Sequence, residues 1–420
     1  MREKSSFVPM IIMGVLFFIF GFVTWLNGSL IPFLKVICYL SDFEALFVSF
    51  SFYIAYTVMA LPMSFVLERV GYKKGMALGL GVMAIGSLLF IPASLSANYL
   101  LFLSALFILG TGLTILQTAS NPYITLIGPI QSAAMRISIM GLINKGAGVL
   151  APLFFTSLIL SGLGNIEDMS AHELEFLTSR LIVPYLVMAG ILIGLLFLVL
   201  FSSLPELEFK SDKMAESQNI FAYPRVVLGA LALFFYVGIE VIAGDTIGLY
   251  AQSIGITNAT SLTSYTMTFM VVGYIVGVLF IPRYLSQEKA LIGSSIVGIF
   301  LLMGVAFSST TSMGVSEFLW GWSGVQTLPN SLVFVALLGL SNALVWPTIW
   351  PLSLEGLGRH TAKASALLIM AIAGGALLPL LFGKIAEISN NMQLSYLFGI
   401  ICYLIIYMYA VKWHKKVSWK

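Results

Sequence analysis

The chain is built around apolar runs that are each long enough to cross a lipid bilayer. Twelve runs of about 20 residues or more alternate with short polar segments. In lipid, a helix satisfies its own backbone polar groups, and the alternating short segments of a β-barrel do not occur in this sequence. We therefore predict an all-α polytopic membrane protein with transmembrane helices at about residues 8–34, 44–67, 76–96, 99–127, 137–160, 181–203, 226–252, 261–282, 289–308, 330–356, 362–388 and 393–411.

The composition excludes several functional classes. Only 9% of the 420 residues are charged, whereas a soluble domain carries about 25%. The two cysteines, Cys38 and Cys402, indicate neither a disulfide framework nor a metal site, and none of the three histidines falls in a predicted span. The predicted spans carry no paired catalytic carboxylates, and the chain has no glycine-rich nucleotide loop. We therefore expect no enzymatic activity, no cofactor and no nucleic-acid partner.

The basic residues fix the expected topology. If the N-terminus lies inside, 17 of the 21 lysines and arginines fall in cytoplasmic segments. This bias follows the positive-inside rule and predicts that both termini are cytoplasmic. Arg2 and Lys4 precede an apolar run that continues as the first span, so no cleavable signal peptide is expected.

The longest polar connection on the inner side divides the chain into two equal sets of spans. Residues 204–225 are charged, contain two prolines and read as a cytoplasmic linker. We therefore predict an N-terminal six-helix bundle over residues 1–203 and a C-terminal six-helix bundle with a short basic tail over residues 226–420.

The two sets of six spans also resemble each other. FFIFG (17–21) in the first span is matched by FFYVG (234–238) in the seventh. The fifth and eleventh spans share the pattern Gly-x-x-x-Pro, at 148–152 and 375–379. The fourth and tenth spans share offsets of 0, 7 and 12, at Gly110, Gln117 and Pro122 and at Gly339, Trp346 and Pro351. These matches occur in the same order in both halves and indicate an internal duplication.

Two homologous six-helix halves joined by an inner loop resemble the major facilitator superfamily, whose substrate sites lie between the halves near the midplane. The segment ERVGYKKG (68–75) resembles the signature inner loop of that superfamily, where acidic and basic residues clamp neighbouring helix ends. The resemblance implies a gating role for Glu68, Arg69, Lys73 and Lys74. We place Arg136, Glu355 and Arg359 in the same gating group. Glu355 and Arg359 lie four residues apart at the inner end of span ten, as a gating or surface pair.

Three segments narrow the resemblance further. FVTWLNGSLIPFLK (22–35), LQTASNPYITLIGP (116–129) and ISIMGLINKGAG (137–148) resemble the fucose–galactose–glucose:proton symporter family, in particular its glucose/galactose branch. The resemblance covers essentially the whole chain. It implies import of a monosaccharide across a bacterial inner membrane, driven by a cation gradient, with a monomer as the default state.

The sequence lacks two carboxylates that the fucose-transporting members of this family carry in their spans. Fucose-transporting members carry an aspartate in span one and a glutamate in span four, where this chain has Gly28 and Gln117. A neutral residue in span four is usual in the glucose/galactose branch. Gly28 follows Gly21 by seven residues, and Asp245 follows Gly238 by the same number in the matched repeat. We predict that the coupling carboxylate has moved to Asp245.

Glu240, Asp245 and Lys145 lie deep inside predicted spans, where a charge needs a partner or a cavity. Glu240 and Asp245 are five residues apart, about 140° around a helix, so they face different neighbours. Lys145 lies roughly 13 Å from the inner end of its span, closer to the level of Glu240, at roughly 22 Å, than to Asp245, at roughly 30 Å. We predict a Lys145–Glu240 pair across the two halves, with Asp245 as the cavity acid. The alternative is a purely structural ion network.

A sugar site needs several hydrogen-bonding groups and an aromatic ring for the apolar face of the sugar. An alternative role for Asn121 is to satisfy carbonyls freed by Pro122, and the tryptophans have packing or lipid-facing roles as alternatives. The candidate ligands in the predicted spans are Trp25, Asn27, Gln117, Asn121, Asn144, Asn342 and Trp346.

The sequence thus predicts a secondary transporter that imports a hexose, glucose or galactose first, by alternating access. Asp245 would respond to the cation: a proton is the family default, and sodium bound at Asp245 is the alternative. Two rivals stay open. One is an uncoupled facilitator in which Lys145 permanently neutralises the acids, and the other is a sugar sensor on a transporter scaffold.

Overall fold

The computed structural model describes residues 7–126, 133–161, 171–205, 220–281, 284–355, 357, 361–416 and 418–419. Within these ranges the secondary structure is helical, without strands. Twelve helical stretches are long and apolar enough to cross a membrane, and each coincides with one of the twelve predicted runs. The predicted all-α membrane fold is therefore confirmed.

Three of the first six spans are not single continuous helices. The first span is divided at Leu26, and a short helix precedes each of the second and sixth spans. In chain order the helices are α1 (Phe7–Trp25), α2 (Asn27–Ile37), α3 (Asp42–Ala45), α4 (Phe47–Val70), α5 (Tyr72–Ser96), α6 (Tyr99–Leu126), α7 (Ala133–Ile159), α8 (Ala171–Ser179) and α9 (Ile182–Phe201).

The last six spans contain interruptions at Thr246 and Leu344. In chain order the α-helices are α10 (Pro224–Asp245), α11 (Ile247–Ser253), α12 (Thr263–Phe280), α13 (Gln287–Phe307), α14 (Gly314–Trp320), α15 (Asn330–Ala343), α16 (Val345–Leu354), α17 (Thr361–Met370), α18 (Gly374–Ser389), α19 (Met392–Ser395) and α20 (Gly399–Val411). The 3-10 segments are η4 (Ile220–Ala222), η5 (Ala259–Ser261), η6 (Gly321–Ser323), η8 (Ala371–Ala373), η9 (Tyr396–Phe398) and η10 (Trp413–Lys415).

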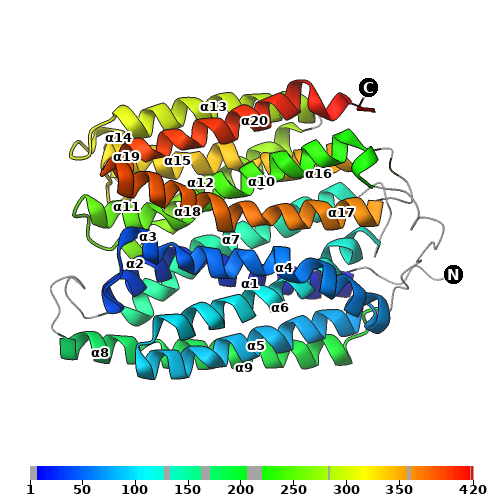
Figure 1. Cartoon of the computed structure of the whole chain (residues 1–420), viewed down its shortest axis with the longest axis horizontal. Helices are drawn as coiled ribbons and strands as arrows, with labels where there is room; N and C mark the ends of the chain where they lie inside the picture. Colours follow the sequence, from blue (N-terminus) through cyan, green and yellow to red (C-terminus); the bar gives the residue numbers. More distant parts are fainter. Residues whose placement is uncertain are drawn as a thin grey trace.

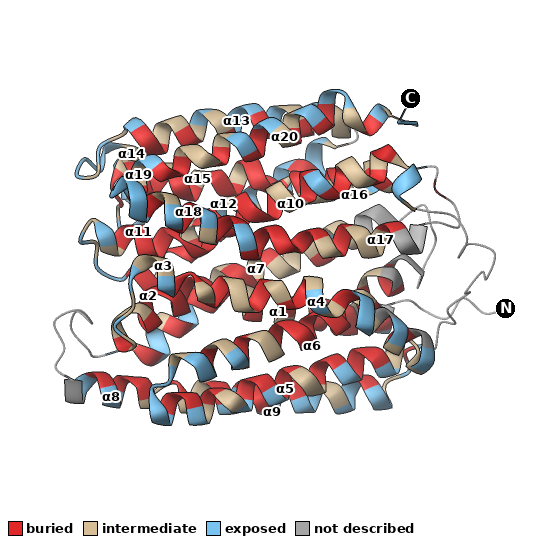
Figure 2. Ribbon diagram, in the orientation of Figure 1, coloured by how far each residue is buried: buried red, intermediate tan, exposed pale blue. Residues whose placement is uncertain are grey.

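The spans lie side by side as two bundles. Figure 1 shows α5 and α9 at one edge of the molecule and α13 and α20 at the opposite edge, with both chain termini at the same end. The other end, which carries α2, α8, α11 and α14, is called the distal end here. The two bundles meet where α4 packs against α18 and α7 packs against α12. Buried residues dominate α10 and α15, in the interior of the second bundle (Figure 2).

Two glycines from the proposed repeat make equivalent contacts. A Cβ atom at Gly110 on α6 would collide with the carbonyl of Phe52 on α4. A Cβ atom at Gly339 on α15 would collide with the carbonyl of Thr266 on α12. In each bundle the fourth span therefore crosses the second span at backbone contact, which only glycine permits. The matched sequence positions are matched in packing as well.

Candidate functional site

An ion pair joins the two bundles in the middle of the molecule. Lys145 Nζ on α7 lies 2.6 Å from Glu240 Oε1 on α10. Both residues are buried, with exposed fractions of 9% and 7%. The predicted pairing of these residues is confirmed, and their part in coupling stays a prediction. Breaking a buried pair of this kind leaves one charge uncompensated, which is costly.

The ring of Trp25 lies beside this pair, at the end of α1. Lys145 Nζ is 4.6 Å from the centroid of the indole, within the range of a cation–π contact. Glycines make room for the ring: a Cβ atom would lie 2.6 Å from it at Gly148 and 2.5 Å from it at Gly244. The indole Nε1 is buried without a hydrogen-bond partner, and so is Nδ2 of Asn27. In this state the Trp25 ring contacts a cation, and its predicted stacking against sugar stays a prediction.

Asp245 is the last residue of α10 and has no exposed surface. One carboxylate oxygen, Oδ2, accepts a hydrogen bond of 2.7 Å from the Ser49 hydroxyl, which belongs to α4 of the first bundle. The other oxygen, Oδ1, is buried and has no hydrogen-bond partner among the described residues. As the helical spacing predicts, Asp245 and Glu240 face different neighbours. Ser49 could not be predicted from the sequence, because a serine near the start of a span carries no signal of its own.

The end of α10 is unusually rich in hydroxyl contacts. Each of its last three carbonyls before Asp245 accepts a hydrogen bond from a threonine side chain, where the helix is interrupted. An ionised Asp245 adds negative charge at the negative end of a helix dipole, which is unfavourable in a buried position. The three hydrogen bonds are Thr246 to Ile242 at 2.6 Å, Thr266 to Ala243 at 3.2 Å and Thr263 to Gly244 at 2.7 Å.

Gly28, where the span-one acid is missing, lies directly against this segment. A Cβ atom at Gly28 would be 3.0 Å from the Gly244 carbonyl and would collide with the Thr263 hydroxyl. An aspartate at position 28 therefore has no room in this arrangement. Gly28 thus lies against the residue that precedes its pseudo-symmetric counterpart, Asp245, at the interface between the bundles, and Asp245 is the one of the two that carries a carboxylate.

Substituting Gly28 by alanine is expected to destabilise the protein by about 1–3 kcal/mol, because the added methyl overpacks a closed contact. Thr263→Ala in the same chain should recover part of this loss, since it removes the hydroxyl that collides. Thermal unfolding of the purified protein in detergent measures both effects. Gly146→Ala is the matched control, because a Cβ atom there meets nothing within 4 Å. Equal unfolding temperatures for Gly28→Ala and Gly146→Ala would contradict the tight packing described here.

The candidate sugar ligands on α6 are partly accessible. Gln117 Nε2 donates to the hydroxyl of Tyr56 on α4 at 3.1 Å. Asn121 lies one turn further along the same face and is also half-buried. Both stay predictions as sugar ligands.

The other predicted ligands also have partners inside their own bundle. Asn144 Nδ2 donates to the Phe17 carbonyl at 3.3 Å, and Asn342 Oδ1 accepts from the Tyr403 hydroxyl at 2.7 Å. Trp346 stacks on another indole at a centroid distance of 5.3 Å. In this state the two amides and the indole of Trp346 already contact other residues of the protein, and a substrate would have to replace those contacts.

Hydrogen bonds join the two bundles at the distal end. The carbonyl of Thr260, in η5, accepts from the Ser29 hydroxyl of α2 at 2.6 Å, and the Thr260 hydroxyl lies 2.8 Å from that of Thr156 on α7. Gln252 Nε2 on α11 donates to the Pro32 carbonyl at 3.2 Å. We call these contacts the distal seam. The structure is therefore closed at its distal end.

The predicted gating residues lie at the end that carries the termini. Arg69 and Lys74 are exposed, and the side chains of Glu68 and Arg359 lie outside the described residues. Glu355 contacts Arg225 NH1 of α10 at 3.3 Å, and its predicted pairing with Arg359 stays a prediction. The two remaining contacts are Lys73 Nζ with the Ser202 carbonyl at 2.8 Å and Arg136 Nε with the Ile124 carbonyl at 2.9 Å.

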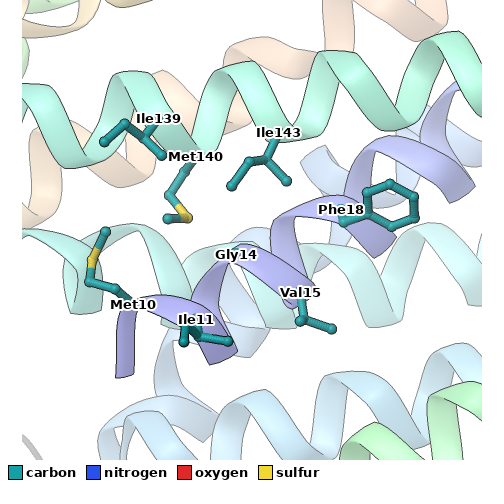
Figure 3. Close-up of a pocket in the computed structure, with 8 residues that line it drawn as sticks. All are labelled: Met10, Ile11, Gly14, Val15, Phe18, Ile139, Met140 and Ile143. Atoms are coloured by element: carbon teal, nitrogen blue, oxygen red, sulfur yellow. The ribbon is translucent and has the colours of Figure 1, made fainter. Parts of the chain in front are cut away.

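Two open hollows are lined mainly by apolar residues. The one in Figure 3 has a volume of about 470 Å³ and lies between α1 and α7. Its lining residues are apolar: Met10, Ile11, Gly14, Val15, Phe18, Ile139, Met140 and Ile143. The second, of about 550 Å³, continues along α7 and includes Phe18 and Ile143. Neither is lined by a predicted sugar ligand, and their apolar walls suit lipid chains.

Comparison with known proteins identifies the family. Residues 13–379 match the sequence profile of the Major Facilitator Superfamily. The chain belongs to the Major Facilitator Superfamily. A curated member, the glucose/galactose transporter of Brucella abortus (strain 9-941), is 34% identical over 97% of this chain and 95% of its own length. The L-fucose-proton symporter of Escherichia coli (strain K12) is 26% identical over 97% of this chain and 94% of its own length.

Solved structures of superfamily members share the fold over nearly the full chain. The transporter FucP in its outward conformation has a TM-score of 0.74 and 25% identity, covering 98% of this chain and all of the other. The xylose transporter XylE in an inward open conformation has a TM-score of 0.71 at 14% identity, which shows the fold alone. The predicted superfamily and symporter family are confirmed by these relatives.

Proposed function

We propose that this superfamily member imports a hexose, glucose or galactose first, together with a proton. The observation that carries the proposal is the arrangement of buried charges: Lys145 and Glu240 form an ion pair, whereas Asp245 on the same helix as Glu240 contacts a serine hydroxyl and no cation among the described residues. The names of two relatives, a glucose/galactose transporter and an L-fucose-proton symporter, support both the substrate class and the coupling ion.

The proposed setting is a bacterial inner membrane with both termini in the cytoplasm, which is supported by the distribution of basic residues. The distal end then faces outward, and the structure represents a state closed to the outside. Residues 1–203 and 226–420 move as the two halves, joined by the linker 204–225. The protein works as a monomer, because both halves of the site belong to one chain.

Charge balance assigns the coupling role to Asp245. Lys145 Nζ lies 2.6 Å from Glu240 Oε1 and balances its charge. The Asp245 carboxylate accepts one hydrogen bond from a hydroxyl, and its second oxygen has no partner among the described residues. Burying an ionised carboxylate under these conditions is costly, and protonation removes the cost. Coupling follows because the halves close around Asp245 readily only after it has taken up a proton.

A proton fits this acid better than sodium does. Hard cations take several oxygen ligands at once. The side-chain contact found at Asp245 is a single serine hydroxyl. A proton needs only the carboxylate itself. Sodium at Asp245 is kept as a measurable alternative.

The sugar would bind between the bundles, among the amides singled out in the sequence. Gln117, Asn121 and Asn144 supply hydrogen bonds from the first half, and Asn342 supplies them from the second. Asn27 adds an amide Nδ2 that has no partner in the described structure. The rings that stack on the sugar would come from Trp25 and Trp346, whose neighbours must then move aside.

A second function, uncoupled facilitation, is favoured by one observation. The Lys145–Glu240 pair is already neutral, so that part of the site needs no cation before it closes. This account assigns Asp245 a structural role. It differs from the first proposal in a single measurable property, because a facilitator only equilibrates sugar across the membrane.

The experiment is uptake of labelled glucose and galactose into right-side-out vesicles that contain the chain, under an imposed proton gradient or an imposed sodium gradient. We expect uptake of at least one hexose, with accumulation of about ten-fold per pH unit for one coupled proton. Unlabelled mannose and fucose compete to define the substrate range. Accumulation under a sodium gradient alone would show that sodium is the coupling ion. Sugar that only equilibrates across the membrane would favour the facilitator. Absence of uptake would contradict hexose transport.

A further inference from the structure

We infer that Ser49 is the positioning partner of Asp245 and sets when that residue releases its proton. This inference rests on the proposed function, and names a regulating contact of the same site. Ser49 Oγ donates to Asp245 Oδ2 at 2.7 Å, and both residues have no exposed surface. Its two members belong to opposite bundles, so the bond depends on how the bundles sit against each other.

The bond depends on closure of the distal end. Ser49 lies in the first turn of α4, and Asp245 ends α10 immediately before α11. The next helix in the chain, α11, takes part in the distal seam through Gln252 and Pro32. Separating the bundles at this end therefore separates Ser49 from Asp245. The hydroxyl reaches the carboxylate only while the path to the outside is closed.

A hydroxyl that donates to a carboxylate favours its ionised form. When the distal end opens, Asp245 loses that donor and holds a proton from outside more readily. When the distal end closes, the hydroxyl returns and helps the proton leave toward the end that carries the termini. The timing matches import, because the proton is taken up on the outer side and released on the inner side.

The other ionisable groups near Asp245 make no hydrogen bond to it among the described residues. Glu240 is on the same helix and is paired with Lys145. Tyr53 lies one turn from Ser49 on α4, and the Tyr396 hydroxyl lies 2.7 Å from that of Thr246, the residue that follows Asp245. Of these groups, Tyr53 alone shares a helix with Ser49, and it is not hydrogen-bonded to Asp245 in the contacts found. Among the described residues, Ser49 is the side chain of the first bundle that donates a hydrogen bond to Asp245.

The test compares Ser49→Ala with Ser49→Thr in right-side-out vesicles. Net sugar uptake requires Asp245 to release its proton inside, whereas sugar counterflow does not. We expect Ser49→Ala to keep counterflow but to lose about ten- to a hundred-fold in net uptake, the range expected for one hydrogen bond to a charged group. Raising the internal pH by about one to two units should restore net uptake, because a lower internal proton concentration favours release of the proton from Asp245. Ser49→Thr retains the hydroxyl and should behave like wild type.

The outcomes separate this inference from the proposed function. If wild type itself accumulates no sugar under a proton gradient, the proposed coupling is wrong whatever Ser49 does. If wild type accumulates sugar and Ser49→Ala does so equally well, Ser49 has no part in proton release. Loss of counterflow in both variants, or a net uptake in Ser49→Ala that internal alkali does not restore, would assign Ser49 to packing and overturn the inference.

Discussion

Replacing Asp245 by asparagine is expected to abolish accumulation of sugar while leaving sugar exchange in place. Asparagine keeps the size of the side chain and an oxygen that accepts from Ser49, but it takes up no proton. The bundles then close without waiting for a proton, because the neutral amide removes the cost of burying a carboxylate. The variant should therefore equilibrate sugar, whereas wild type concentrates it by about ten-fold for each imposed pH unit.

The measurement is the final ratio of internal to external labelled hexose, taken together with the counterflow rate. Glu317→Gln is a matched control, since it makes the same chemical change at an exposed acid on α14, and it should accumulate sugar like wild type. Accumulation by Asp245→Asn at the level of wild type would mean that Asp245 is structural. Coupling would then have to reside in Glu240 and Lys145, or be absent.

The second large effect concerns the ion pair between the bundles. Lys145→Met leaves Glu240 buried without its cation, and we expect a loss of about 3–5 kcal/mol in the free energy of unfolding. Glu240→Gln should cost a comparable amount, since it leaves the lysine unpaired. Joining the two changes in one chain removes both charges and should recover most of the loss. Thermal unfolding in detergent and the yield of folded protein measure these differences.

An exposed pair in the same protein provides the control. Lys384 and Glu387 on α18 are also paired, but their side chains are 52% and 50% exposed. Lys384→Met should therefore change the free energy of unfolding by about 0–1 kcal/mol. A cost for Lys145→Met as small as that for Lys384→Met would contradict the burial of the pair. A double variant no more stable than either single variant would show that the two residues do not act as a pair.

The fold and the main charge pair could be predicted from the sequence because both follow from simple distances. Hydrophobic length defines the spans, and the rise per residue places Lys145 near the level of Glu240. The repeat alignment also brought Gly28 and Asp245 into correspondence, and the structure places Gly28 against the segment that ends at Asp245. The depth of a residue in its span and its counterpart in the internal repeat can both be read from the sequence by counting residues.

The contacts that depend on helix rotation could not be predicted. Ser49 and Thr263 are two of many hydroxyls in apolar spans, and their periodicity does not say which neighbour they face. Glu355 likewise contacts Arg225, 130 residues earlier in the chain, and nothing in the local sequence indicates that contact. Packing between helices that are distant in the chain determines such contacts, and the pattern of residues in a single sequence does not indicate which helices pack together.

Proton movement driven by sugar is the most direct test of proton-coupled hexose import. Vesicles without an imposed pH gradient are given an inward gradient of glucose or galactose, in sodium-free medium, while the external pH is recorded. Our account predicts that the external medium becomes more alkaline with wild type and does not change with Asp245→Asn. Entry of labelled sugar into wild-type vesicles with no change in external pH would contradict proton coupling.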